Sequence, residues 1–316
     1  MPLAPRPFLN RQQLAAFALL ALALGLPAAL PAASARVNVT PEVDADYHPP
    51  VPHPAYDGEQ HPAVWIDEGH REAFTAAGRL RPFTELLTRD GYRVKAYKGA
   101  LQQDRLAATD ILVIVDPLGA GAADRPAFSP AEIETLRGWV EAGGSLLLAA
   151  GPAPAGRAAA SLAKAFGVEM SQGQTFDPEH TPDATPTTWI AYTRASGLLG
   201  DTLLTHGRDD SERVDTAVTF RGQSLRGPED STALLRLGDA ALDRFDDGDT
   251  LGAAGHAQAI YLERGKGRVL VLGDPALLTA QQVGNGALKI GMNRPGNDDR
   301  QLTLNLLHWL SHLLNS

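Results

Sequence analysis

Side chains that can bind metals or move protons follow several apolar runs of this chain, at points where buried strands are expected to end. The candidate ligand-binding residues are Asp67, Glu68, His70, Asp116, Gly151 and Asp274. Carboxylates and imidazoles hold divalent cations and act as general acids and bases. Because the carboxyl ends of parallel strands meet at one edge of a sheet, we expect these residues to line one crevice.

The aspartates in this set also have a structural interpretation. Asp67, Asp116 and Asp274 each precede a turn into the next expected element, where a carboxylate can accept backbone N–H groups as a helix cap. A capping role explains only one side chain in the cluster of Asp67, Glu68 and His70, which favours function for that cluster. The sequence leaves capping and function as alternatives at each aspartate.

Several other chemistries are excluded by what the sequence lacks. There is no cysteine, which removes disulfides, thiolate zinc sites, a cysteine nucleophile and an anchor on a lipidated cysteine. No Gly-x-Ser-x-Gly motif occurs at a strand-to-helix turn, and Gly151-Pro152 places no nucleophile after the fourth expected strand. No glycine-rich dinucleotide or phosphate motif follows a strand. We therefore predict no catalytic nucleophile and no cofactor.

Three further sets of side chains carry only part of a metal-site pattern. They are His48, His53 and His61 in a proline-rich segment, the acidic stretch 239–249, and the i, i+4 pair His308 and His312. The first set is irregularly spaced, the second lacks the ligand order of a calcium loop, and the third has no acid between its histidines. We interpret them as a linker, an exposed loop and part of a closing helix, and we predict no metal.

The segment 129–151 organises the expected fold. Ser129, Pro130 and Glu132 form a capping-box pattern, and apolar residues then recur at helical spacing. Gly143 supplies a left-handed helix stop, and the following apolar run 145–150 is typical of a strand buried on both faces of a parallel sheet. This segment is one helix–strand unit.

Similar units recur along the chain and indicate the fold class. Strands are expected at 63–66, 92–97, 111–115, 145–150, 258–263 and 268–272. Helices are expected after 70 and over 129–142, 158–166 and 301–314, and a short helix or turn is expected over 101–108. Strands that alternate with helices predict an α/β fold with a doubly wound, mostly parallel, flavodoxin-like sheet. The segment at about 172–252 is rich in Thr, Asp, Gly and Pro with short β-like runs, and we interpret it as a β-rich insertion.

The N-terminal region predicts export. Residues 1–35 combine early arginines, a continuous apolar run and the small residues Ala33-Ser34-Ala35, as in a signal peptide cleaved after Ala35. The alternative is a retained membrane anchor, since the apolar run is near the lower length limit for a spanning helix. A proline-rich linker follows over 36–62, and the α/β domain occupies 63–316. We expect a periplasmic or secreted protein that contacts a membrane only if the N-terminal segment is retained.

The net charge limits the class of partner. The chain carries 37 acidic and 28 basic residues in 316, a formal charge of −9, whereas a nucleic-acid surface needs clustered basic residues. We therefore expect no nucleic acid, and instead an unknown small molecule or an envelope protein as the partner.

Four motifs in this order resemble a known family. They are IDEGH (66–70), EIETLRGWVEAGGSLLLAAG (132–151), RVLVLGDPALLTAQ (268–281) and GMNRPGNDDRQLTLNLLHWLSHLL (291–314). They are similar to an uncharacterised group of exported bacterial domain-of-unknown-function proteins with a class I glutamine-amidotransferase-like fold. Relatives of that group include the GldG-type auxiliary component of gliding and ABC-transport systems and the N-terminal domain of an intraflagellar-transport protein. Members of the group often have Asp-His where this chain has Gly151-Pro152.

Three functions follow as hypotheses. The resemblance, together with the missing cysteine, implies an amidotransferase-like domain reused for binding a small ligand or a partner protein at the crevice. The second hypothesis is a metal-assisted hydrolase that uses Asp67, His70 and Asp274. The third is a structural subunit of an envelope transport assembly. Convergence of His70, Asp67 and Asp274 on one point would favour the hydrolase.

Overall fold

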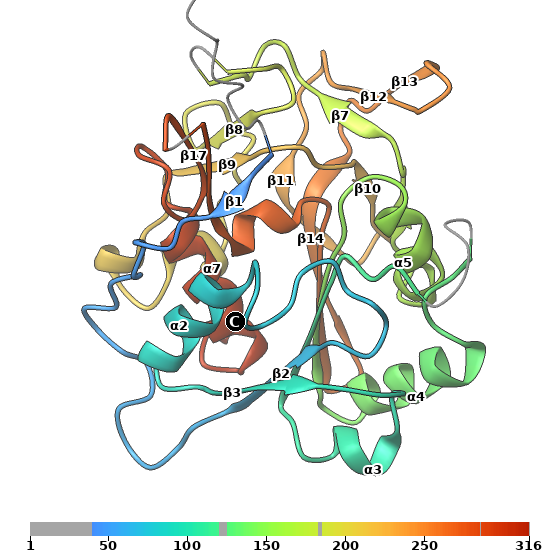
Figure 1. The fold of residues 1–316 in the computed structure, drawn as a ribbon, viewed down its shortest axis with the longest axis vertical. Helices are drawn as coiled ribbons and strands as arrows, with labels where there is room; N and C mark the ends of the chain where they lie inside the picture. Colours follow the sequence, from blue (N-terminus) through green and yellow to red (C-terminus); the bar gives the residue numbers. More distant parts are fainter. Residues whose placement is uncertain (1–39, 120–124, 183–184, 285, 316) are drawn as a thin grey trace, which may run out of the picture. The chain divides into compact units, whose positions relative to one another are not determined.

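The computed structural model describes residues 40–119, 125–182, 185–284 and 286–315. They belong to one compact unit, Asn38–Ser316 (Figure 1). The predicted signal peptide 1–35 and its cleavage site lie outside the described residues. Within the described ranges, no helix has both the length and the apolar composition needed to cross a membrane.

A large, mostly parallel sheet lies at the centre of this unit. Its parallel strands, in spatial order, are β3 (Arg93–Tyr97), β2 (Ala63–Asp67), β4 (Ile111–Val115), β5 (Ser145–Ala149) and β15 (Gly267–Leu272). Every residue of β4 and β5 is buried, as the uninterrupted apolar runs predict for strands covered on both faces. The ends of β2, β4, β5 and β15 form one edge, which we call the carboxyl edge.

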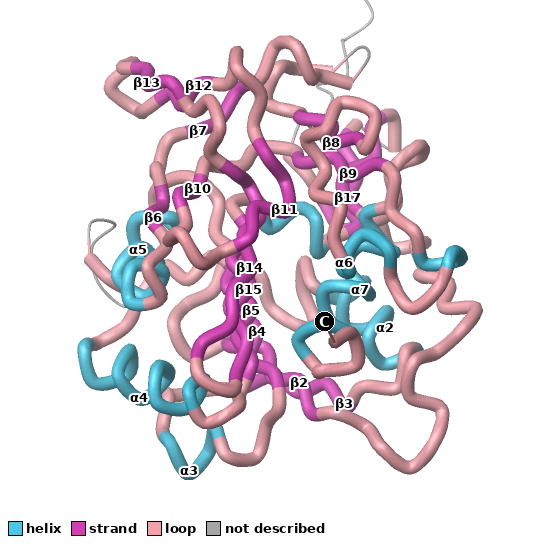
Figure 2. Tube along the Cα trace, turned by 180° about the vertical axis from the view of Figure 1, so that it is seen from behind, coloured by secondary structure: helices cyan, strands magenta, loops and turns pink. Residues whose placement is uncertain are grey.

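Helices cover both faces of the sheet, as Figure 2 shows. One face carries α3 (Gln103–Leu106), α4 (Pro130–Glu141) and α5 (Ala155–Ala165), and the other carries α2 (Arg81–Arg89), α6 (Leu203–His206) and α7 (Asp299–Leu310). Helix α4 begins with the predicted capping box, in which Ser129 and Glu132 each accept the other's backbone N–H. It ends before Gly143, whose φ of 126° is open to glycine at little cost. The mixed α/β architecture is confirmed.

Antiparallel strands extend the sheet beyond β15. Strand β14 (Ala257–Arg264) forms a hairpin with β15 and also pairs with β10 (Leu225–Arg226) and β11 (Thr232–Arg236), while β6 (Glu169–Met170) pairs with β10. Strands β10 and β11 belong to the segment predicted as an insertion. That segment therefore contributes directly to the main sheet.

The remaining strands form three small antiparallel sheets. Their members are β1 (Glu42–Val43), β16 (Ala280–Val283) and β17 (Leu288–Gly291); β7 (Gln174–Phe176), β12 (Leu242–Arg244) and β13 (Thr250–Gly252); and β8 (Ile190–Thr193) with β9 (Thr216–Thr219). Two short 3₁₀ helices, η1 (Asp210–Glu212) and η2 (Pro275–Leu278), complete the elements.

Three details differ from the sequence-based expectations. The stretch 239–249 is not simply an exposed loop, because β12 lies within it and buries Asp243. Strand β17 is not among the expected strands, because its four residues are too few to give a periodic signal. The helix expected after residue 70 begins only at Arg81, because turns and bends occupy most of the intervening residues.

The described part of the proline-rich segment packs along the domain. Strand β1 pairs with β16, the N–H of Ala55 donates to Asp90 Oδ1 at 2.8 Å, and the hydroxyl of Tyr56 donates to Ser311 Oγ at 2.8 Å. These contacts hold residues 42–56 against α2 and the C-terminal segment.

Candidate functional site

His70 occupies the loop after β2 and joins it to the start of α4. Its Nδ1 lies 2.6 Å from Asp67 Oδ2, and its Nε2 lies 3.0 Å from Glu132 Oε1. The His70 side chain is 8% exposed and Asp67 is fully buried. A methyl group on Gly69 would lie 2.4 Å from the carbonyl oxygen of Gly99, so the close approach of these loops requires glycine here.

The two carboxylates determine the protonation of His70. An ionised carboxylate only accepts hydrogen bonds, so both ring nitrogens donate and the ring is an imidazolium. Burial disfavours this charge, but the hydrogen bonds and charges of Asp67 and Glu132 outweigh it and raise the pKa of His70 to about 9. Burial likewise opposes the charge on Glu132, yet the bonds from Ser129 and His70 lower its pKa to about 2.

Glu72 completes a buried group of three ionisable side chains. Its carboxylate oxygens accept the backbone N–H of His70 at 3.1 and 3.0 Å. Burial, and then the charge of Asp67, raise the pKa of Glu72 to about 8. One ligand atom each of Asp67, His70 and Glu72 lies within 4.8 Å of the others, the spacing of a potential metal site. A metal here would have to displace the proton on His70 Nδ1.

Glu68 lies apart from this group. Its Oε1 accepts the backbone N–H of Ala76 at 3.0 Å, and its Oε2 lies 3.7 Å from the ammonium of Lys98. Among the described residues, no hydrogen bond or ion pair joins Glu68 to His70. Its side chain instead stabilises the turn that precedes α2.

The other predicted residues form a second group, at the ends of β4, β5 and β15. Asp116 Oδ1 accepts the N–H of Gly151 at 2.8 Å, and Asp116 adopts a left-handed φ of 47° that is unusual for a residue with a side chain. Burial raises the pKa of Asp116 to about 7. The hydrogen bond from Gly151 lowers this pKa, and the nearby charge of Asp274 raises it. Asp116 is thus poised between its two protonation states near neutral pH.

Asp274 acts as a cap. Its Oδ1 accepts the N–H of Ala276 at 2.9 Å, and its Oδ2 accepts the N–H groups of Phe220 and Arg221 at 2.5 and 3.3 Å. Burial raises its pKa, although these bonds favour the charged form. Among the described residues, no hydrogen bond or ion pair connects Asp274 to His70. The described residues therefore give no sign of the convergence on one point that would favour the hydrolase.

Among the described residues, backbone hydrogen bonds join the loops that carry the two groups. The N–H of Ala73 donates to the carbonyl of Asp116 at 3.0 Å, and the N–H of Gly119 donates to the carbonyl of His70 at 2.8 Å. Sequence reasoning missed Glu72 and Glu132 as partners of His70. Glu132 was visible only as a capping residue, and its second role depends on a contact between residues 62 positions apart.

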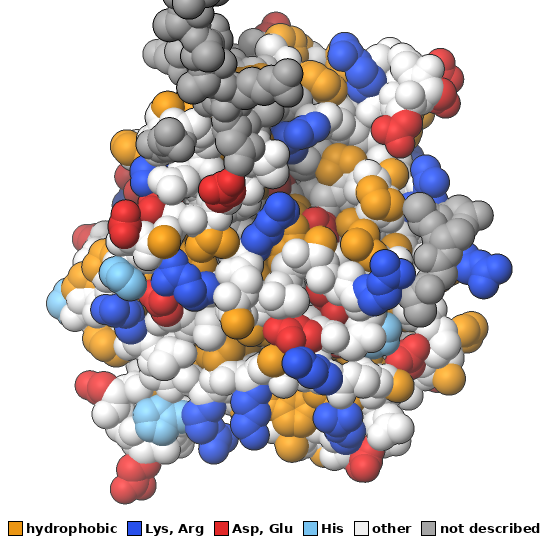
Figure 3. Space-filling view, in the orientation of Figure 1, with side chains coloured by type: hydrophobic (Ala, Val, Ile, Leu, Met, Phe, Trp, Pro, Cys, Tyr) orange, Lys and Arg blue, Asp and Glu red, His pale blue; other side chains and the backbone are white. Residues whose placement is uncertain are grey.

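A cavity of about 380 Å³ lies beside the carboxyl edge, next to the residues that follow β5. Pro152, Ala153, Arg221 and Arg244 are among its lining residues, and we call it the arginine cavity. The Arg244 guanidinium lies 4.6 Å from the centre of the Phe176 ring. In the described part of the chain, neither arginine forms an ion pair. Figure 3 shows basic and acidic side chains on the same face, with hydrophobic side chains between them.

The other histidine sets do not assemble into metal sites among the described residues. Nε2 of His308 lies 2.7 Å from Asp90 Oδ2 in the core, whereas His312 follows α7 with a left-handed φ of 60°. His48 pairs with Glu85, and His61 lies 2.7 Å from the carbonyl oxygen of Gly91.

Comparison with known families decides the classification. Residues 80–288 match DUF4350, a domain of unknown function. The chain belongs to the DUF4350 family. No curated protein matches the sequence.

Solved structures agree with the fold. The mmIFT52 N-terminal domain is similar to this chain with a TM-score of 0.58 and 13% identity, over 78% of this chain and 97% of that domain. The cytoplasmic protein STM3548 from Salmonella typhimurium has a TM-score of 0.47 and 14% identity, over 79% and 98% of the two chains. A ThuA-like protein from Parabacteroides merdae has a TM-score of 0.44 and 11% identity, over 80% and 90%. The likeness to the intraflagellar-transport domain confirms that part of the predicted resemblance.

Proposed function

We propose that this DUF4350 protein is an exported, non-catalytic α/β domain that binds a small ligand at its carboxyl edge. The observation that carries the proposal is the state of His70, whose two ring nitrogens both contact carboxylates. A general base needs a free lone pair, and an imidazolium has none. Asp274 is likewise occupied by backbone N–H groups. His70 and Asp274 instead hold the loops of the edge in place.

The arginine cavity is the place where a ligand fits best. Arg221 and Arg244 lie in its wall without an ion-pair partner among the described residues, and both are exposed. Guanidinium groups bind carboxylates and phosphates through paired N–H donors. We therefore infer a small ligand that carries a carboxylate or phosphate group. A partner protein with an acidic side chain at this point offers the same chemistry.

A calorimetric titration with citrate and with inorganic phosphate tests this assignment. We expect at least one of the anions to bind the wild-type protein and to bind the Arg221→Gln variant about tenfold more weakly, the loss of about 1.4 kcal/mol. The matched control is Arg137→Gln, which removes an exposed arginine on α4. Absence of binding by both anions, or equal binding by Arg221→Gln and wild type, would overturn the assignment of an anionic ligand.

One observation favours the metal-assisted hydrolase as a second candidate. Asp67, His70 and Glu72 lie close enough to share a cation. Zinc bound there would take His70 Nδ1 from Asp67 and release protons. A thermal-shift titration with zinc, in wild type and in Asp67→Asn, distinguishes the two functions. Stabilisation by zinc that depends on Asp67 would support the hydrolase. If zinc does not stabilise the wild-type protein, the result supports a carboxyl edge that is not catalytic.

The proposal also includes export of the protein and its relationship to amidotransferase-like domains. The predicted signal peptide supports export to the periplasm or beyond, and the motif resemblance supports an amidotransferase-like, flavodoxin-related fold with GldG-type relatives. Among the described residues, the large exposed hydrophobic side chains are Leu251, Leu288 and Leu313, on three different segments. Single exposed apolar side chains are normal on a protein surface. They give the hypothesis of a structural assembly subunit little support.

A further inference from the structure

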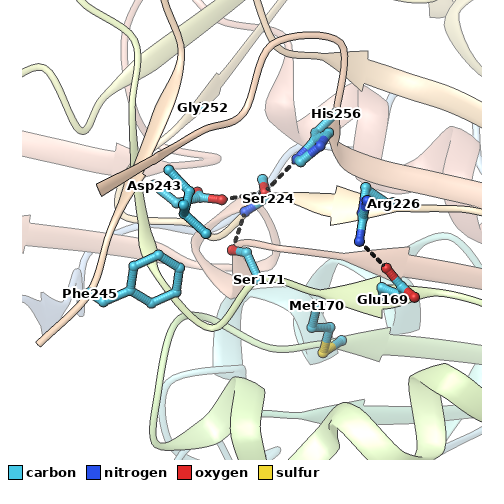
Figure 4. Close-up of a pocket in the computed structure, with 10 residues that line it drawn as sticks. Glu169, Met170, Ser171, Ser224, Arg226, Asp243, Phe245, Gly252 and His256 are labelled. Atoms are coloured by element: carbon cyan, nitrogen blue, oxygen red, sulfur yellow. Dashed lines mark hydrogen bonds and ion pairs between the residues drawn. The ribbon is translucent and has the colours of Figure 1, made fainter. Parts of the chain in front are cut away.

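A second cavity, of about 370 Å³, lies between the β6–β10 edge of the main sheet and the β12–β13 hairpin and shares the lining residue Phe245 with the arginine cavity (Figure 4). Three polar side chains from separate segments meet in its wall: Ser224, Asp243 and His256. We call it the hairpin cavity. Ser224 is 1% exposed and Asp243 is 2% exposed, so their contacts form a built polar network.

The hydrogen bonds of this network determine which group carries each proton. Asp243 Oδ1 accepts the hydroxyl of Thr175 at 2.6 Å, and Oδ2 accepts the hydroxyl of Ser224 at 2.6 Å. Both oxygens are acceptors, as in an ionised carboxylate. Ser224 has one proton and gives it to Asp243, so at 3.0 Å it can only accept from Nδ1 of His256. In the neutral ring, the remaining nitrogen, Nε2, then keeps its lone pair.

This order of groups differs from that of a nucleophilic triad. In such a triad the histidine lies between the serine and the acid and takes the serine proton. Here Ser224 lies between His256 and Asp243, and its proton is held by the acid. Ser224 is therefore a positioning residue that fixes the tautomer and the orientation of His256. In metal sites, a hydrogen bond from the second ring nitrogen fixes the tautomer and orientation of a histidine in a similar way.

His256 stays neutral in this environment. Burial lowers its pKa and the charge of Arg226 lowers it further, against the opposing charge of Asp243. Among the described residues, no hydrogen bond reaches Nε2. The cavity thus holds an uncharged acceptor that the protein has oriented and left without a partner.

The rest of the wall supplies a donor and an apolar surface. Ser171 Oγ accepts the N–H of Ser224 at 3.2 Å, and its own proton has no acceptor among the described residues. Phe245 lines the cavity, and Leu251 on β13 is 63% exposed beside it. At the rim, Arg226 is paired with Glu169, so neither offers a free charge.

We propose that the hairpin cavity binds an uncharged hydroxylated ring compound, that is, a sugar. A ligand hydroxyl donates to Nε2 of His256, another accepts from Ser171, and the C–H face of the ring packs on Phe245. An anion would face the buried charge of Asp243 with no free cation in the wall. The volume is at the lower end of the range for small-molecule sites.

Saturation-transfer NMR with glucose, N-acetylglucosamine and cellobiose tests the proposal. We expect transfer to the ring protons of at least one sugar, and binding about fivefold weaker in His256→Phe, the loss of one hydrogen bond. Phe245→Ala is expected to weaken binding to a similar degree. The control Leu288→Ala removes an exposed apolar side chain on β17 and should bind as the wild type does.

Three outcomes would overturn the proposal. They are no transfer to any of the three sugars, equal binding in wild type and Phe245→Ala, and equal binding in wild type and His256→Phe. A ¹⁵N spectrum of the wild-type protein tests the proton count without a variant. A proton on Nδ1 alone of His256 supports the assignment of Nε2 as the free acceptor. A proton on Nε2 alone contradicts that assignment.

Discussion

Replacing His70 with glutamine should make the pH dependence of stability weaker in a defined window. The pKa of His70 is raised from its ordinary 6.5 to about 9, so the folded state binds this proton more tightly than the unfolded state. The resulting stabilisation is fully present below about pH 6.5 and is lost as the pH rises through about 9. Each pKa unit corresponds to about 1.4 kcal/mol, so the imidazolium contributes about 3 kcal/mol at low pH.

Urea unfolding at about pH 6 and about pH 9.5 measures this contribution. His70→Gln should be destabilised at both values, because Asp67 and Glu132 lose a hydrogen-bonding partner at either pH. The destabilisation should be about 3 kcal/mol larger at the lower pH. The control His48→Gln removes a histidine whose side chain is 60% exposed, and its effect should be small at both values.

Glu72 also titrates in this range and lies 3.8 Å from His70 Nδ1, so both measurements are repeated in the Glu72→Gln background, which removes its titration. If the destabilisation by His70→Gln is the same at both pH values, the ring is not charged in the folded protein. The proposal that Asp67 and Glu132 hold His70 as an imidazolium would then be wrong.

Three further predictions concern the same scaffold. Glu72→Gln should become more stable relative to wild type as the pH rises from about 4.5 to about 8. In this range the unfolded wild-type chain releases the proton of Glu72 while the folded protein holds it, so the wild type loses stability. Urea unfolding at about pH 4.5 and about pH 8 measures the difference. Gly69→Ala should cost about 2 kcal/mol in urea unfolding, because its methyl group would contact the Gly99 carbonyl. Leu147→Ala, in fully buried β5, should cost about 3 kcal/mol in the same assay.

Some parts of the fold were predictable because their signal is local. A strand buried on both faces must be apolar throughout, so β4 and β5 stand out as uninterrupted runs. The start of α4 was legible because a capping box needs fixed residue types three positions apart. Strands β10 and β17 have two and four residues, too few for a periodic pattern.

The site was predictable only where its residues are close in sequence. Asp67 and His70 are three positions apart, and their contact follows from one loop. The bond from His70 to Glu132 depends on how the loop after β2 reaches the start of α4, which no local pattern reports. The hairpin cavity was missed for the same reason. Its network joins residues 224, 243 and 256 through antiparallel pairing that the sequence does not specify.

The protonation of His70, with and without zinc, tests the central claim most directly. A ¹⁵N NMR spectrum of the protein at about pH 7.5 reports both ring nitrogens, and the account predicts that both are protonated because the pKa is about 9. Addition of one equivalent of zinc should leave the spectrum unchanged. An unprotonated nitrogen, or a ring signal shifted by zinc, would show that His70 is free to act as a base or ligand and would contradict a non-catalytic edge.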